Sequence, residues 1–252
     1  MNAKELLFRS HRFDLSFKFL YALHRYDGEQ AFAPYREMYL ESIRLFNGFY
    51  EDSPLKNGAE DFLLSFDSLI ESVRDNGFDD TFAIPIDILG NPLNGAHRLA
   101  TAAALDLDVP VVADKKVIKP FCDDYRHFYA RKRCADRKLL DRCAMEFVER
   151  NSLMRCMTIP KTASIGTYRR VHETIWRQGC FWLKRCGRDR ELWLFIPNSP
   201  DFAPPPCAEG AKICIKHQDT IDEARDFFGK LSGAGNPISN KMRRILNPYS
   251  GV

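Results

Sequence analysis

The sequence predicts a mixed fold of the α/β or α+β class, and three patterns along its 252 residues support this prediction. Apolar residues recur at helical spacing near the N-terminus, helical and strand-like segments alternate in the middle, and a strand hairpin accompanies helices toward the C-terminus. We therefore expect three regions: helices over residues 1–58, a central core over 59–119 and a mixed region of helices and strands over 120–252.

The first region contains two aromatic-rich stripes that are typical of helix faces packed on a core. Their members are Phe13, Phe17 and Leu20 in the first stripe, and Tyr39, Ile43 and Phe46 in the second. Residues 26–34 between the stripes are expected to form a loop, because Gly28 and Pro34 interrupt the helical pattern. Residues 50–58 are more polar and predict a second loop.

The central region alternates between helical and strand patterns. The expected elements are a helix over 60–78, a strand over 82–88, a turn at Gly90-Asn91, a helix over 96–107 and a strand over 109–113. Gly77 supplies the left-handed residue that ends the first helix. The first strand follows from the alternation of Ile84, Ile86 and Ile88 with other residues, and Leu93 is expected to begin a return strand after the turn.

The last region begins near Lys119, where a run rich in arginine and lysine follows the predicted core. The expected elements are helices over 136–151, 162–179 and 219–233, a hairpin over 180–197 around Gly187 and a strand over 212–218. Thr220 and Glu223 have the spacing of a capping box that would open the last helix. Residues after Gly233 are expected to be loose or partly helical.

The composition is that of an ordinary soluble protein with a mild positive charge. The formal net charge is +3 and the pI is about 8.4, which suits anionic ligands but falls short of a dedicated nucleic-acid-binding protein. Charged residues from Arg9 to Lys18 interrupt the apolar N-terminus. We therefore expect no signal peptide, no membrane partner and a cytoplasmic location.

The eight cysteines contain no C-x-x-C pair. We therefore expect reduced thiols, and neither a disulfide scaffold nor a structural zinc site. Cys122 with His127 is a candidate nucleophile and base, but no third residue is positioned to orient them.

The turn Asn94-Gly95-Ala96-His97-Arg98 is the main candidate site. A strand that feeds a glycine turn and opens directly into a helix places free backbone N–H groups and the positive end of the helix dipole at one point, which attracts anions. His97 and Arg98 can add charge-assisted bonds to phosphate oxygens, and Asn94 can cap the helix or touch a ligand. Spacing alone favours a simpler interpretation, an ordinary helix start with Asn94-Gly95 as cap and solvated His97 and Arg98.

The order of the surrounding features resembles the ParB/sulfiredoxin superfamily over residues 60–113. In that superfamily a helix leads to a strand, then to a G-x-x-R turn, and then to an alanine-rich helix and a V-P-V strand. The corresponding pieces here are residues 69–77, 84–88, 95–98 and 102–112. The resemblance implies a nucleotide site, with the phosphates of ATP, ADP or CTP on the turn.

Differences within the turn separate the members of the superfamily. Sulfiredoxins carry a cysteine where this chain has Ala96, so sulfinic-acid reduction is not expected. Partitioning ParB proteins have an acidic-Arg-Arg turn and a downstream recognition helix, and neither pattern is found here. Free serine kinases have a D-G-x-H-R turn, which this sequence matches except that Asn94 replaces the acid. A neutral amide can only hydrogen-bond where a carboxylate could help to hold a metal.

The kinase resemblance implies further roles. It implies Mg²⁺, and a glutamate ahead of the preceding helix that activates the acceptor hydroxyl; the candidate here is Glu51, with Asp52 as a near alternative. An ordinary solvated acid is an equally good interpretation of Glu51, and a surface lysine is the favoured interpretation of Lys56. His97 and Arg98 would stabilise the transferred charge.

Three functions follow as hypotheses. The first is a nucleotide-dependent phosphotransferase that acts on a small hydroxyl-bearing metabolite or sugar. The second is a non-catalytic ParB-like regulator that binds nucleotide or DNA, and the third is a scaffold with a vestigial turn.

Two basic clusters are weaker candidates for anion binding. The run from Arg126 to Arg142 could bind DNA, but few aromatic residues accompany it, so a solvated helix face is favoured. Arg169, Arg170 and His172 could bind a second anion from one helix, although surface placement is again favoured. DNA is therefore an alternative partner that the sequence does not favour.

Overall fold

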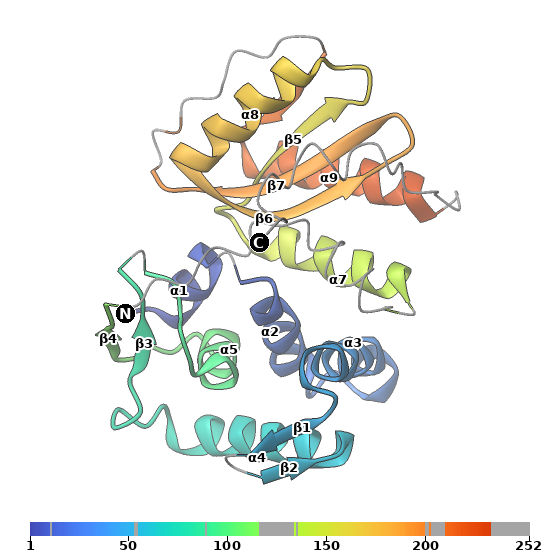
Figure 1. Cartoon of the computed structure of the whole chain (residues 1–252). Coiled ribbons are helices and arrows are strands. Elements are labelled where there is room, and N and C mark those ends of the chain that lie inside the picture. The colour runs from blue at the N-terminus through green and yellow to red at the C-terminus, as the bar shows by residue number, and fades with distance from the viewer. Residues whose placement is uncertain are drawn as a thin grey trace.

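The structure, a computed structural model, describes residues 1–10, 12–52, 55–88, 90–115, 134, 136–199, 202 and 210–232. Eight helices and three sheets of two to four strands occupy these residues, which confirms the predicted mixed α/β class (Figure 1). None of the helices in these ranges is both long enough and apolar enough to cross a lipid bilayer.

The N-terminal half consists of helices with two short sheets. The helices are α1 (Ala3–Arg9), α2 (Asp14–His24), α3 (Glu29–Asn47), α4 (Ala59–Asn76) and α5 (Ala96–Ala104). The strands are β1 (Tyr50–Asp52) and β2 (Leu55–Asn57), which form an antiparallel hairpin, and β3 (Ile84–Ile86) and β4 (Val111–Ala113), which pair in parallel. Both α1 and α2 pack directly against α5, so the segments 1–58 and 59–119 share one core.

The C-terminal half is a four-stranded antiparallel sheet with helices on both faces. Its elements are α7 (Arg137–Arg150), β5 (Arg155–Pro160), α8 (Ile165–Gln178), β6 (Gly179–Cys186), β7 (Arg190–Pro197), β8 (Lys212–Cys214) and α9 (His217–Ser232). The strand order is β6-β7-β5-β8. Trp193 and Phe195 of β7 face α8, whereas Leu192, Leu194 and Ile196 face the larger core, as the two-residue period of a strand requires.

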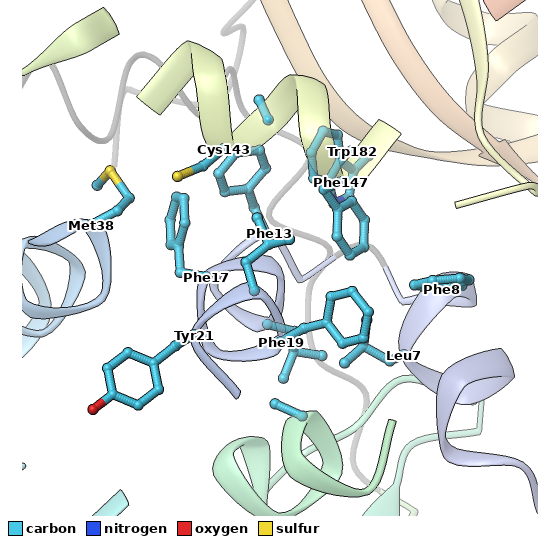
Figure 2. Close-up of a cluster of buried hydrophobic side chains, with 14 of the residues drawn as sticks. Leu7, Phe8, Phe13, Phe17, Phe19, Tyr21, Met38, Cys143, Phe147 and Trp182 are labelled. Atoms are coloured by element: carbon cyan, nitrogen blue, oxygen red, sulfur yellow. The ribbon is translucent and has the colours of Figure 1, made fainter. Parts of the chain in front are cut away.

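The two halves meet in an aromatic cluster between α2 and α7. The ring of Phe147 on α7 stacks on Trp182 at 4.9 Å, and Phe13 lies 4.4 Å from the same indole. Phe8 contacts both Phe147, at 5.6 Å, and Phe19, at 5.7 Å. Figure 2 shows these rings filling the space between the helices. One continuous hydrophobic core therefore joins the N-terminal helices to the C-terminal sheet.

Several helix ends are as predicted because local residues determine them. Gly77 has φ 78° and ends α4, where its N–H donates to the Val73 carbonyl at 2.9 Å. Gly179 ends α8, and the predicted hairpin is formed by β6 and β7.

The loop predicted over residues 26–34 is wrong, because α3 begins at Glu29 and contains Pro34. Gly28, at φ 87°, is the residue before the helix. The burial of Phe32 and Tyr35 on either side of the proline stabilises the helix by roughly 1.5–3 kcal/mol each, which offsets the cost of about 3 kcal/mol for an interior proline.

Other local predictions are also wrong. The loop over 50–58 is mostly the β1–β2 hairpin, and Phe46 is 48% exposed although it was expected in the core. Thr220 does not cap α9, since the helix begins at His217 and the Thr220 hydroxyl donates to the Lys216 carbonyl at 3.1 Å. Glu223 instead accepts from Lys212 at 2.6 Å. The predicted boundary near Lys119, and the tail after Gly233, lie outside the described residues.

A polar network ties α2 to α7 beside the aromatic cluster. The imidazole of His24 lies between two carboxylates, with Nδ1 2.5 Å from Asp27 Oδ2 and Nε2 2.5 Å from Glu146 Oε1. Its ring stacks on Tyr35 at 4.1 Å, and the Tyr35 hydroxyl donates to Glu146. Burial opposes a charge on His24, but the hydrogen bonds and charges of Glu146 and Asp27 outweigh it and raise the pKa of His24.

We predict a pH-dependent stability that originates at His24. Because its pKa is raised in the folded state, its contribution is fully present below the unfolded pKa of about 6.5 and is lost as the pH rises through the higher folded pKa. His24→Gln should lower the free energy of unfolding by about 1–3 kcal/mol at pH 6, as measured by urea unfolding. The free energy of unfolding of this variant should also fall less steeply as the pH rises above 6. His217→Gln is the control and should keep the decline. An unchanged pH profile in His24→Gln would contradict this assignment.

The shared core also predicts cooperative unfolding of the two halves. Phe147→Ala should lower the free energy of unfolding by about 3–5 kcal/mol, because it leaves a cavity next to Trp182 and Phe8. Calorimetry should still record a single transition at a lower temperature. Two separate transitions in the wild-type protein would mean that the halves do not share a core.

Candidate functional site

The predicted turn forms the start of α5 as an open helix end. Gly95 precedes the helix with φ 74° and ψ 26°, and no side chain caps it. The Oδ1 atom of Asn94 accepts from the Gly95 N–H at 2.7 Å, so Asn94 does not cap the first helical turn. In the part of the chain that the structure describes, the N–H groups of Ala96, His97 and Arg98 have no protein acceptor. These three amides are free to bind an anion.

Glycine is required at position 95 for two reasons. Its positive φ belongs to the left-handed region, which L side chains rarely adopt. A Cβ atom at this position would also lie 2.9 Å from Ile84 Cδ1 and 3.0 Å from Arg98 Nη2. The β3 strand and the Arg98 side chain therefore close around the turn.

The Arg98 side chain lies against the loop that precedes β3. Its Nη1 donates to the Phe82 carbonyl at 2.7 Å, and its guanidinium lies 5.5 Å from the centre of the Phe82 ring. The Phe82 ring is 57% exposed. The bond to the backbone uses one of five guanidinium donors, so Arg98 is held beside the turn with further donors for a ligand.

His97 points from the turn toward α3 and α4. Its Nε2 lies 3.0 Å from the Tyr39 hydroxyl, and its ring packs edge-on against Phe66 at 4.7 Å. Burial, followed by the positive charges of Lys18 and Lys56, lowers the pKa of His97 well below its ordinary value. The imidazole is therefore neutral at pH 7. It can exchange hydrogen bonds with a ligand, but it does not supply the positive charge expected from the sequence.

The β1–β2 hairpin brings Glu51 to the same region. Glu51 and Lys56 are register partners on its inner face, and Lys56 Nζ donates to Glu51 Oε2 at 2.7 Å. The Lys56 side chain is only 11% exposed and its ammonium lies 4.9 Å from the centre of the Phe62 ring, so the surface interpretation of Lys56 is wrong. The negative charge of Glu51 is near enough to Tyr39 to add to the effect of burial, which raises the pKa of that phenol.

Asp52, the alternative to Glu51, belongs to the outer face of the hairpin. It accepts a hydrogen bond from the Tyr50 hydroxyl, and both residues are exposed. The alternation along β1 therefore selects Glu51 as the carboxylate that lies toward His97.

An ion cluster at the start of α2 lies behind the turn. Arg12 binds the Asp14 carboxylate through two bonds of 3.0 and 2.7 Å, and Lys18 Nζ donates to the same carboxylate at 2.9 Å. Burial alone would raise the pKa of Asp14, but the charges of Lys18 and Arg12 outweigh it and hold the pKa well below its ordinary value. Arg12 also donates to the Pro92 carbonyl at 3.1 Å, which connects the cluster to the loop before Gly95.

Sequence reasoning used these α2 charges only as interruptions of an apolar segment. The available signal was the i, i+4 spacing of Asp14 and Lys18 within a helix whose other residues are mostly apolar. That spacing predicts an ion pair on the helix, but it does not predict that α5 packs against it.

Those of the other sequence candidates that the structure describes do not converge on the turn. Cys122, His127 and most of the basic run lie outside the described residues. Arg169 and Arg170 are exposed on α8, while the ring of His172 lies 6.2 Å from Trp193. Over the described residues, no group of three or more His, Cys, Asp or Glu side chains could hold a metal ion.

Comparisons of this chain with protein-family models, with curated proteins and with solved structures find no match. The ParB/sulfiredoxin resemblance therefore enters the functional argument only as a hypothesis, beside the geometry of the turn.

We predict that Gly95→Ala destabilises the protein. The left-handed backbone and the contacts with Ile84 and Arg98 together should lower the free energy of unfolding by about 1–3 kcal/mol, measured by urea unfolding. Gly229→Ala is the matched control, because Gly229 lies within α9 with open space around it and should gain about 0.4–1 kcal/mol. Equal effects of the two substitutions would contradict the geometry of the turn.

Proposed function

We propose that the protein is a cytoplasmic nucleotide-dependent phosphotransferase that acts on a hydroxyl group of a small metabolite or sugar. ATP and ADP are the favoured donors, with CTP as a third candidate. The observation that carries this proposal is the set of three uncapped amides at Ala96, His97 and Arg98, surrounded by mostly positive side chains.

The balance of charge around the turn supports a polyphosphate ligand. Four cations, Arg12, Lys18, Lys56 and Arg98, are opposed by two carboxylates, Asp14 and Glu51. Burial is the main cause of the lowered pKa of His97, and the charges of Lys18, Lys56 and Arg12 add to it while Asp14 opposes it. A di- or triphosphate would neutralise this excess, and the helix end would bind its oxygens through backbone N–H groups.

Glu51 is the proposed general base. Its side chain is 41% exposed, so an acceptor can approach it, and it accepts a hydrogen bond from Lys56 Nζ. The acceptor oxygen would bond to the terminal phosphorus as its proton passes to Glu51. The bond from that phosphorus to the bridging oxygen would break, and the nucleotide would leave with one phosphate fewer. Arg98 and the three amides would stabilise the charge on the phosphate oxygens.

Mg²⁺ would enter this site with the nucleotide. Magnesium commonly binds through phosphate oxygens, water and one or two carboxylates, so a cluster of protein ligands is not needed. Asp14 is bonded to two cations, Asn94 is a neutral amide and Glu51 is assigned as the base, so phosphate oxygens and water would supply the ligands of the ion. The ion would neutralise charge on the transferred phosphate.

Substitution at Glu51 tests the proposed chemistry once turnover is detected. Calorimetry with ATP, ADP and CTP in the presence of Mg²⁺ measures binding, and a metabolite-library screen identifies the acceptor. Glu51→Gln should then lower kcat by roughly 10²–10⁴-fold and leave nucleotide affinity nearly unchanged. Asp52→Asn, on the outer face of the same hairpin, is the control and should keep full activity.

Three outcomes would contradict this proposal. Absence of binding to all three nucleotides removes the nucleotide site. Binding without turnover of any acceptor favours the non-catalytic regulator, and full activity of Glu51→Gln removes Glu51 as the base.

Arg98→Ala tests the phosphate contacts separately. Loss of charge-assisted bonds worth about 1.5–3 kcal/mol should weaken ATP binding by roughly tenfold or more, and the rise in melting temperature caused by ATP should shrink accordingly. A vestigial turn would show the same ATP response with and without Arg98.

A further inference from the structure

Lys18 is a buried cation in the middle of the most buried helix of the N-terminal half. The residue is 6% exposed, and the α2 residues from Leu15 to Ala22 are all buried. Lysine is rarely buried to this extent unless an anion accompanies it, because the transfer of an ammonium group out of water is costly.

In the described part of the chain, Lys18 shares its anionic partner with a second cation. Among the described residues, its one hydrogen-bond acceptor is Asp14, and Arg12 binds both oxygens of that same carboxylate. Two cations therefore share one negative charge, with side chains that are 18%, 12% and 8% exposed for Arg12, Asp14 and Lys18. A buried ion cluster with a net positive charge is unfavourable until another anion compensates it.

The geometry of α2 directs Lys18 toward the Gly95 turn. Tyr21, one turn further along the same face of the helix, stacks on Phe66 at 4.9 Å and contacts Tyr39 at 4.8 Å. These two rings also contact His97, at 4.7 and 5.7 Å. Lys18 is also the charge that contributes most, after burial, to the lowered pKa of His97. The cluster of Lys18, Asp14 and Arg12 reaches the loop before Gly95 through the bond from Arg12 to the Pro92 carbonyl.

We propose that Lys18 binds a phosphate oxygen directly, so that the anion site of this protein is formed by α2 as well as by the first turn of α5. The ligand class is a linear polyphosphate with two or more phosphate groups. One end would meet the amides at 96–98 and Arg98, and the other would meet Lys18, which completes the charge balance of the α2 cluster. This inference rests on the proposed function only in placing phosphate at the Gly95 turn.

Titration with inorganic tripolyphosphate tests this inference without any chemical step. Calorimetry should detect binding to the wild-type protein, and Lys18→Met should weaken it by about tenfold or more, as expected for the loss of a charge-assisted bond. The melting temperature of ligand-free Lys18→Met should be equal to or higher than that of the wild type, since Asp14 keeps Arg12 and the net buried charge disappears. Lys230→Met, which removes an exposed i, i+4 partner of Asp226, is the control and should keep wild-type affinity.

A second measurement on the wild-type protein covers the case in which Lys18→Met does not fold. Imidazole NMR should show the pKa of His97 rising when tripolyphosphate binds, because the ligand neutralises the cations around the ring.

The possible results separate this inference from the proposed function. Unchanged tripolyphosphate affinity in Lys18→Met, or an unchanged His97 pKa on binding, overturns the role of Lys18 even if nucleotide turnover is found. A Lys18-dependent affinity supports the inference even if no acceptor is ever phosphorylated. A wild-type protein that binds neither tripolyphosphate nor ATP overturns both.

Discussion

The packing of α2 between α5 and α7 is the constraint on which the rest of the structure depends. A helix that is buried all round must satisfy a different neighbour on each face. Phe13 and Phe19 pack into the aromatic cluster with α7 and the C-terminal sheet, whereas Tyr21 packs on the aromatic residues around His97. One helix makes both contacts (Figures 1 and 2). The packing of α2 against α5 therefore also determines where the charges of Asp14 and Lys18 lie behind the Gly95 turn.

This arrangement explains why His97 is neutral beside the uncapped start of α5. The ring is placed among Tyr39 and Phe66 and close to Lys18 and Lys56, so both burial and charge oppose its protonation. The positive charges near the turn are instead those of lysine and arginine side chains. The Asn94 side chain does not cap the first amides of α5, because its oxygen accepts from the adjacent Gly95 N–H instead.

The sequence predicted those parts of the molecule that local residues determine. Gly77, Gly95 and Gly179 each mark a helix boundary, and α4, β3, α5 and β4 lie close to their expected ranges. The return strand expected from Leu93 is wrong, since, among the described residues, only an isolated bridge between Ile86 and Pro92 forms there. The central strand β5 escaped prediction because its residues Cys156 to Ile159 are all buried and show no alternation. The continuation of α3 through Pro34 was not predicted, because the burial of neighbouring side chains outweighs the local tendency of proline to interrupt a helix.

For the site, the sequence identified the turn but not its surroundings. Glu51 was a candidate by position, and the pairing of β1 with β2 places it on the inner face beside Lys56. Lys56 looked like a surface residue because a three-residue strand has too few positions to display a period. The location of Lys18 behind the turn could not be predicted from the sequence. It depends on the packing of α2 against α5, and some eighty residues of sequence separate Lys18 from α5.

The most direct test of this account is the response of the backbone amides at 96–98 to ATP, followed by ¹H–¹⁵N NMR of the full chain. The account predicts that the largest changes in chemical shift fall on Ala96, His97 and Arg98, because phosphate oxygens accept hydrogen bonds from these groups. Binding of ATP that leaves these three resonances in place, or no binding at all, would contradict it.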